Sequence, residues 1–112
     1  MSKALIAKMR AAREQTVEVG GFGFVVRRPT EMDMIEWGDQ TMGREALKHI
    51  VGWSGVKESD VLPNGDPEPL DYDAEVAEEW LTDRADLLAP LTEKVIGSFR
   101  DHVAKREAAE KN

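Results

Sequence analysis

Two adjacent glycines between β-rich runs constrain the fold of this 112-residue chain more than any other feature. Residues 16–19 alternate in polarity, and residues 22–28 are again rich in aromatic and β-branched side chains. Gly20 and Gly21 separate the two runs, and glycine readily adopts the positive φ angles of a tight turn. The pattern therefore predicts a β-hairpin over residues 17–28. A phosphate-binding loop is excluded, because its glycines open a helix and here another strand follows.

Helix-forming patterns lie on both sides of this hairpin. Residues 3–14 are good helix formers with an apolar side chain on each helical turn. Thr30 is a suitable N-cap for a second helix that ends near residues 38–43. We expect that helix to bury three apolar side chains, namely Met34, Ile35 and Trp37.

The middle of the chain changes from helix to strand and then to a loop. We predict that a short helix from Arg44 gives way near Ile50 to an extended segment that reaches Val56. Residues 62–69 contain three prolines and the turn pair Asn64-Gly65. These residues favour a loop over a helix or a paired strand.

The last third of the chain is predicted to be helical. Asp73 can cap a short helix, and apolar side chains recur at helical spacing through residues 86–107, where we expect a long helix. Residues 106–112 are expected to form a frayed tail. The predicted fold class is α+β, in one domain over residues 1–112. It combines a small antiparallel sheet, made by the N-terminal hairpin and one central strand, with packed helices and a long C-terminal helix.

The negative charge of the chain is concentrated in one segment. The net charge is −7, yet residues 57–83 hold ten acids and one base, so this segment carries −9 and the rest +2. Such an acidic face repels a phosphate backbone, and this argues against a nucleic-acid partner. Residues 57–73 are predicted to form an acidic, proline-rich loop whose charge keeps a small protein in solution.

No residue pattern points to catalysis or to a metal. The chain has no cysteine, which excludes disulfides and thiolate zinc sites. His49 and His102 are more simply surface or core residues than catalytic ones, and an enzyme remains an alternative only if His49 and an acid converge in a pocket. The acids of residues 66–73 do not match a calcium-binding loop. No apolar run is long enough for a membrane span. We therefore expect a cytosolic protein that is not an enzyme and uses no cofactor.

The aromatic side chains offer two interpretations. They can pack in the core, or some can anchor a partner, since exposed aromatic residues often dominate protein interfaces. Trp53 is the strongest candidate anchor because glycines flank it at positions 52 and 55. The candidate partner-binding residues are Trp53, Val56, Trp37, Phe22 and Phe24.

Several short motifs follow one another between residues 25 and 105. Arg28-Pro29-Thr30 follows the predicted hairpin, and residues 51–56 read Val-Gly-Trp-Ser-Gly-Val. An acidic Asn-Gly-Asp turn with Pro-x-Pro comes next, then an acidic helix ending in Trp-Leu-Thr-Asp-Arg at residues 80–84, and then the long helix. This order resembles the tail assembly chaperones of long-tailed bacteriophages.

The resemblance implies transient binding to the tape measure protein, or to another phage tail protein, in the host bacterial cytoplasm. Such a chaperone keeps its long helical client soluble until tail tube subunits assemble around it. The resemblance leaves open whether the chain also forms a homo-oligomer. One alternative is a structural minor tail or tail-completion protein that stays in the virion. A second alternative is an acidic mimic of DNA, which the proline-interrupted segment 57–83 disfavours.

Overall fold

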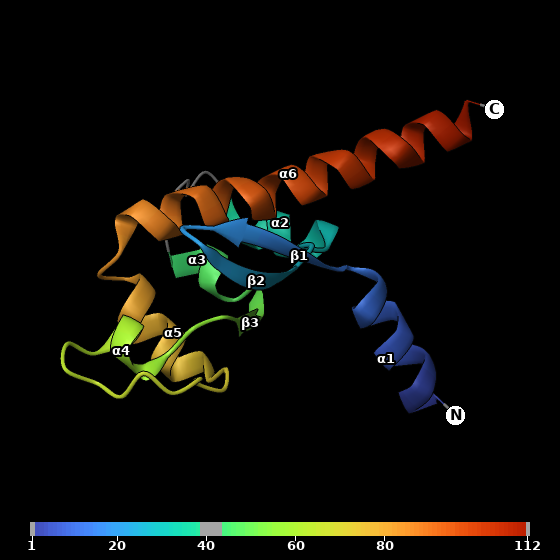
Figure 1. Cartoon of the computed structure of the whole chain (residues 1–112). Helices are drawn as coiled ribbons and strands as arrows, with labels where there is room; N and C mark the ends of the chain where they lie inside the picture. Colours follow the sequence, from blue (N-terminus) through green and yellow to red (C-terminus); the bar gives the residue numbers. More distant parts are fainter. Residues whose placement is uncertain (1, 39–43, 112) are drawn as a thin grey trace.

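A three-stranded antiparallel sheet lies at the centre of the structure, a computed structural model that describes residues 2–38 and 44–111 (Figure 1). The strands are β1 (Glu14–Val19), β2 (Phe22–Arg27) and β3 (Ile50–Ser54), and β2 is the central strand. The helices are α1 (Ser2–Ala12), α2 (Glu31–Trp37), α3 (Arg44–Leu47), α4 (Glu58–Val61), α5 (Ala74–Leu81) and α6 (Ala85–Glu110). This architecture confirms the predicted α+β class, with β3 as the strand predicted to begin near Ile50 and α6 as the long last helix.

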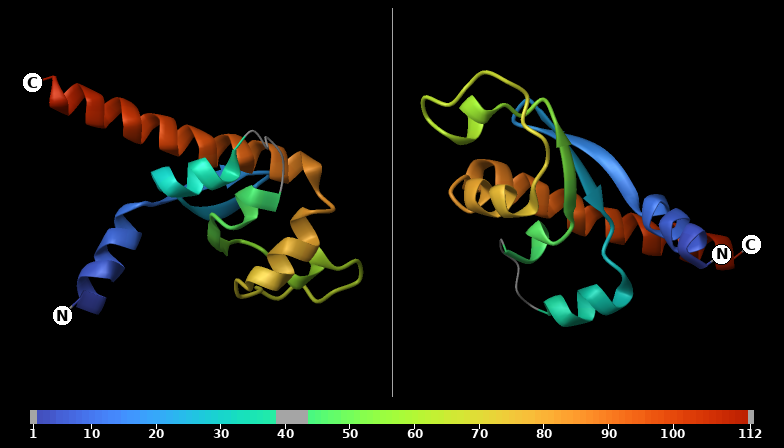
Figure 2. Two further views of the ribbon diagram at one scale, coloured as in Figure 1. Left: turned by 180° about the vertical axis from the view of Figure 1, so that it is seen from behind. Right: turned by 90° about the horizontal axis from the view of Figure 1, so that it is seen from below.

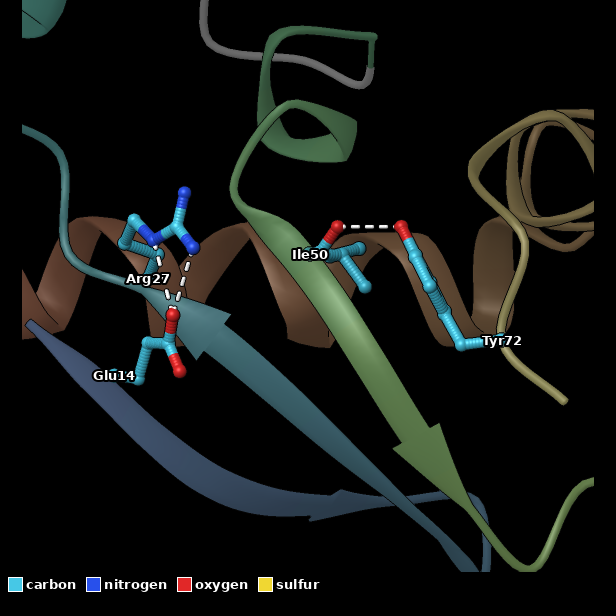
Figure 3. Close-up of polar contacts among 4 residues, drawn as sticks. All are labelled: Glu14, Arg27, Ile50 and Tyr72. Carbon is cyan, nitrogen blue, oxygen red and sulfur yellow. Dashed lines mark hydrogen bonds and ion pairs between the residues drawn. The ribbon is translucent and has the colours of Figure 1, made fainter. Parts of the chain in front are cut away.

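The predicted hairpin is present, and its turn is set by glycine chemistry. β1 and β2 pair from Glu14 opposite Arg27 to Val19 opposite Phe22. Gly20 and Gly21 have φ angles of 61° and 85°, which side chains with a Cβ rarely adopt. At the open end of the hairpin the Glu14 carboxylate accepts two hydrogen bonds from the Arg27 guanidinium, at 3.2 and 2.7 Å (Figure 3).

Both predicted helix caps are present. The Thr30 hydroxyl accepts a hydrogen bond from the Asp33 backbone N–H at 3.1 Å, and the Asp33 carboxylate accepts one from the Thr30 N–H at 2.9 Å. Asp73 accepts hydrogen bonds from the first backbone N–H groups of α5. These side chains satisfy N–H groups that the helices themselves leave unpaired.

The core forms where the first half of α6 crosses the sheet. Alternating residues of β2, Phe24 and Val26, are fully buried, as expected for a central strand with one covered face. α5 and α6 supply six further large buried side chains: Trp80, Leu81, Leu87, Leu88, Leu91 and Val95. Figures 1 and 2 show that α6 continues well past the sheet, and its buried residues end at Val95.

Several details differ from the sequence-based predictions. Ile35 is 72% exposed, because the short helix α2 turns Trp37 inward instead. β3 ends at Ser54 rather than Val56, since Gly55 has a φ of 76° and leaves the extended conformation. The short helix α4 was not predicted within the loop. Finally, α6 ends at Glu110, beyond the predicted end near residue 107.

Backbone hydrogen bonds between its two ends hold the acidic loop in place. Pro69 has no N–H to donate, yet it forms an isolated antiparallel bridge with Lys57 because neighbouring groups make the hydrogen bonds. Leu70 N–H donates to the Val56 carbonyl at 2.8 Å, and Glu58 N–H donates to the Glu68 carbonyl at 3.1 Å. The prolines therefore do not exclude strand-like pairing here, contrary to the prediction.

The two turn glycines allow a matched test of packing at the hairpin. A Cβ on Gly20 would clash with Cδ2 of buried Leu87, whereas a Cβ on Gly21 would meet open space. Both alanine substitutions carry a backbone cost of about 1–2 kcal/mol at positive φ. We predict that Gly20→Ala lowers the free energy of unfolding by about 1–3 kcal/mol more than Gly21→Ala, measured by urea denaturation. Equal losses would mean that Leu87 moves aside without cost.

Candidate protein-binding surfaces

An aromatic cluster joins the sheet to α5, and it contains three of the candidate residues. The Trp80 ring centroid lies 5.3 Å from that of Phe22, 5.8 Å from that of Trp53 and 6.3 Å from that of Phe24. The first two pairs have edge-to-face geometry. This arrangement matches the electrostatic preference of aromatic rings and stabilises the packing of β2 and β3 against α5.

Trp53 is part of this core rather than a free anchor. It is half-buried, and its indole N–H donates a hydrogen bond to the Leu70 carbonyl at 2.8 Å. Its ring also meets Tyr72 edge-on, with centroids 5.0 Å apart. The flanking glycines, which made Trp53 a candidate anchor, instead belong to the strand and its end.

The other candidates are also structural. Phe24, Trp37 and Val56 are buried, and Phe22 is half-buried in the aromatic cluster. Trp37 lies apart from that cluster and stacks on the His49 ring at a centroid distance of 5.8 Å. A partner can therefore contact Phe24, Trp37 and Val56 only if the core opens, whereas Phe22 and Trp53 keep part of their surface exposed.

Apart from Leu62, the large exposed apolar side chains of the described residues lie on α1 and α2. On α1 the exposed fractions are 59% for Leu5, 45% for Ile6 and 54% for Met9. On α2, Met32 is 61% exposed and Ile35 is 72% exposed, and we call these two residues the α2 pair. Their i, i+3 spacing was visible in the sequence, but Met34 and Trp37 have the same spacing. Only the tertiary structure shows which face is covered.

A groove between α4 and α5 combines apolar and acidic side chains. It encloses about 420 Å³ and is lined by Val61, Glu75, Val76, Glu79 and Trp80. The two valines and the indole are apolar, and the two glutamates are exposed at the rim. Neither glutamate has an ion pair among the residues that the structure describes. We call this feature the α4–α5 groove.

His49 lines a polar depression together with three carboxylates, those of Asp33, Glu36 and Glu45. Burial lowers the pKa of His49 below its ordinary value, although Asp33 and Glu45 lie near enough to oppose the shift. Burial also opposes ionisation of Asp33, but its hydrogen bonds with Thr30 outweigh this and lower the pKa of the carboxyl. Within residues 2–38 and 44–111, no three histidine or carboxylate side chains are grouped to hold a metal ion.

Two further findings bear on the class of protein. No helix in the described ranges has both the length and the apolar character needed to cross a bilayer. Comparisons of the chain with family models, with curated proteins and with solved structures find no match.

The buried histidine gives the stability of the protein a defined pH dependence. As the pH falls through the ordinary histidine pKa, the unfolded chain takes up a proton at His49 before the folded chain does. We therefore predict that the free energy of unfolding decreases between about pH 7.5 and about pH 5.5. His49→Phe, which retains a ring against Trp37, reduces that slope in urea denaturation.

His102→Gln serves as the control for this pH series. Burial together with Arg28 and Arg106 also lowers the pKa of His102, which therefore contributes with the same sign. The His102→Gln variant retains the part of the slope that belongs to His49. A His49→Phe variant with the wild-type slope would contradict the assignment.

Proposed function

We propose that this chain is a non-enzymatic phage tail assembly chaperone, which transiently binds the tape measure protein and keeps it soluble in the host bacterial cytoplasm. The order of motifs over residues 25–105 supports the choice of client. The exposed α2 pair is the structural observation that carries the protein-binding role. A long helical client presents apolar stripes that aggregate unless they are covered.

The α2 pair is suited to contact such a stripe. Met32 and Ile35 project from one helix, and methionine adapts its shape to different apolar partners. Burying one such side chain fully contributes about 1.5–3 kcal/mol. Because association itself costs several kcal/mol, the pair supports no more than a weak, reversible contact, which is what a transient chaperone requires.

Helix α2 holds the pair in a defined position. The reciprocal hydrogen bonds of Thr30 and Asp33 fix its first turn. The Arg106 guanidinium of α6 donates to the Glu31 carboxylate at 2.6 Å, and this contact lowers the pKa of Glu31. Both groups are well exposed to solvent, so the ion pair orients α2 more than it stabilises the fold.

The acidic segment supports the same role. Its charge of −9 over residues 57–83 keeps a complex with an apolar client in solution through repulsion between complexes. This segment presents its carboxylates on α4, on α5 and on the intervening loop, which a hydrogen bond from Trp53 ties to the sheet. Solubility and client contact are thereby assigned to different parts of the chain.

The proposal predicts that the α2 pair is needed to keep the client soluble. Upon co-expression, the wild-type chain raises the soluble fraction of the tape measure protein. Met32→Glu/Ile35→Glu returns that fraction to its level without the chaperone, because client affinity falls about 100-fold or more. Leu62→Glu is the matched control, since Leu62 is 55% exposed on a different element. The Leu62→Glu variant raises the soluble fraction of the client as much as the wild type does.

Two outcomes would contradict this function. The first is a client whose soluble fraction is unchanged by the wild-type chain. The second is recovery of the chain from purified virions by mass spectrometry, because a chaperone leaves before the particle is complete. That result would instead support a structural minor tail or tail-completion protein.

A further inference from the structure

Helix α1 carries an apolar stripe that nothing in the described structure covers. Figure 1 shows α1 directed away from the sheet and from α6, and it has no buried residue. Its three large apolar side chains, Leu5, Ile6 and Met9, are all exposed. A helix of 11 residues on its own is only marginally stable in water. Covering the stripe would therefore also stabilise the helix.

The charges on α1 are all positive. The helix contains Lys3, Lys8 and Arg10 and no acid, which gives it +3 in a chain of net charge −7. With 3.6 residues per turn, Lys8 and Arg10 flank the stripe of Leu5 and Met9 on opposite sides. None of the three cations has an ion-pair partner among the described residues.

The α4–α5 groove has the complementary pattern. Its apolar side chains are Val61, Val76 and Trp80, and its rim carries the unpaired carboxylates of Glu75 and Glu79. It lies in the segment that holds the −9 charge. A basic amphipathic helix can place apolar side chains into the groove and its cations beside the carboxylates.

The α1 helix of the same chain cannot occupy this groove. Figures 1 and 2 show α1 and the pair α4 and α5 at opposite ends of the sheet. Strand β1 alone spans about 20 Å, and only Arg13 links it to α1. Docking of α1 within one chain would require β1 to leave the sheet. A second copy has no such restriction.

We propose that α1 of one copy binds the α4–α5 groove of a second copy, and that the exchange is reciprocal. One 11-residue helix covers little of the roughly 1,200–2,000 Å² typical of a specific interface, so two equivalent contacts are favoured over one. The shape of the chain agrees with this exchange. Its radius of gyration is 15.6 Å, against about 13 Å expected for a compact domain of this length.

A charge-exchange experiment tests the proposal with the full chain. One variant carries Lys8→Glu/Arg10→Glu, and the other carries Glu75→Lys/Glu79→Lys. All four positions are exposed, so both variants are expected to fold, which circular dichroism checks. In analytical ultracentrifugation the wild type forms a dimer. Each variant alone dimerises about tenfold more weakly or worse, because like charges now face each other.

The equimolar mixture of the two variants is the decisive sample. Its mixed dimer pairs an acidic helix with a basic groove and a basic helix with an acidic groove. We expect its affinity to return to within about threefold of the wild type. General effects of net charge predict a different pattern, because Glu75→Lys/Glu79→Lys lowers the charge of each copy from −7 to −3 and would strengthen its own dimer by reducing repulsion. Weaker dimerisation of that variant, together with the restored mixture, therefore identifies facing charges as the cause.

Three results would overturn the proposal. They are a wild type that remains monomeric at about 100 µM, variants that dimerise as well as the wild type, and a mixture that stays monomeric. If the wild type is monomeric, the groove could instead bind a basic helix of the client. A photo-crosslinking residue placed at position 76 would then become linked to the client. The α2 pair lies on another element, so Met32→Glu/Ile35→Glu leaves the dimer intact and separates failure of this inference from failure of the chaperone role.

Discussion

The packing of aromatic rings around Trp80 is the interaction on which the rest of the structure depends. Trp80 comes from α5, whereas Phe22 and Phe24 come from β2 and Trp53 from β3, so the cluster joins distant parts of the chain. Such rings bury large areas and add a geometric preference to the apolar gain. They fix the position of α5 against the sheet, and α6 follows after a short turn.

The same cluster orders the acidic segment that precedes α5. Trp53 donates to the Leu70 carbonyl, and the Tyr72 hydroxyl donates to the Ile50 carbonyl at 2.6 Å (Figure 3). These two hydrogen bonds tie the end of the proline-rich loop to β3, immediately before the cap at Asp73. The carboxylates of this segment repel one another, and contacts with the uncharged strand β3 hold the segment in place. Its carboxylates can stay in water, where their charge costs least.

The features that could be predicted from the sequence are those that depend on residues a few positions apart. The glycine turn, the Thr30 and Asp73 caps and the period of α6 each depend on neighbours within a few residues, and all are present. The environment of Trp53 depends on Leu70, Tyr72 and Trp80, far along the chain, so no local pattern reveals it. The two candidate surfaces were missed for the same reason, because exposure of an apolar residue is a tertiary property.

The way the chain uses its apolar residues links the fold to its proposed roles. Its tryptophans and phenylalanines are buried or half-buried, whereas its large exposed apolar side chains are aliphatic and lie on α1, α2 and at Leu62. Aromatic anchors favour tight binding, and flexible aliphatic side chains suit contacts that must form and later break. A chaperone that leaves its client, and a dimer of small interfaces, both require contacts of the second kind. Because the α2 pair lies outside the core, gaining or losing the client need not disturb the packing around Trp80, whereas the proposed dimer contact reaches Trp80 itself through the α4–α5 groove.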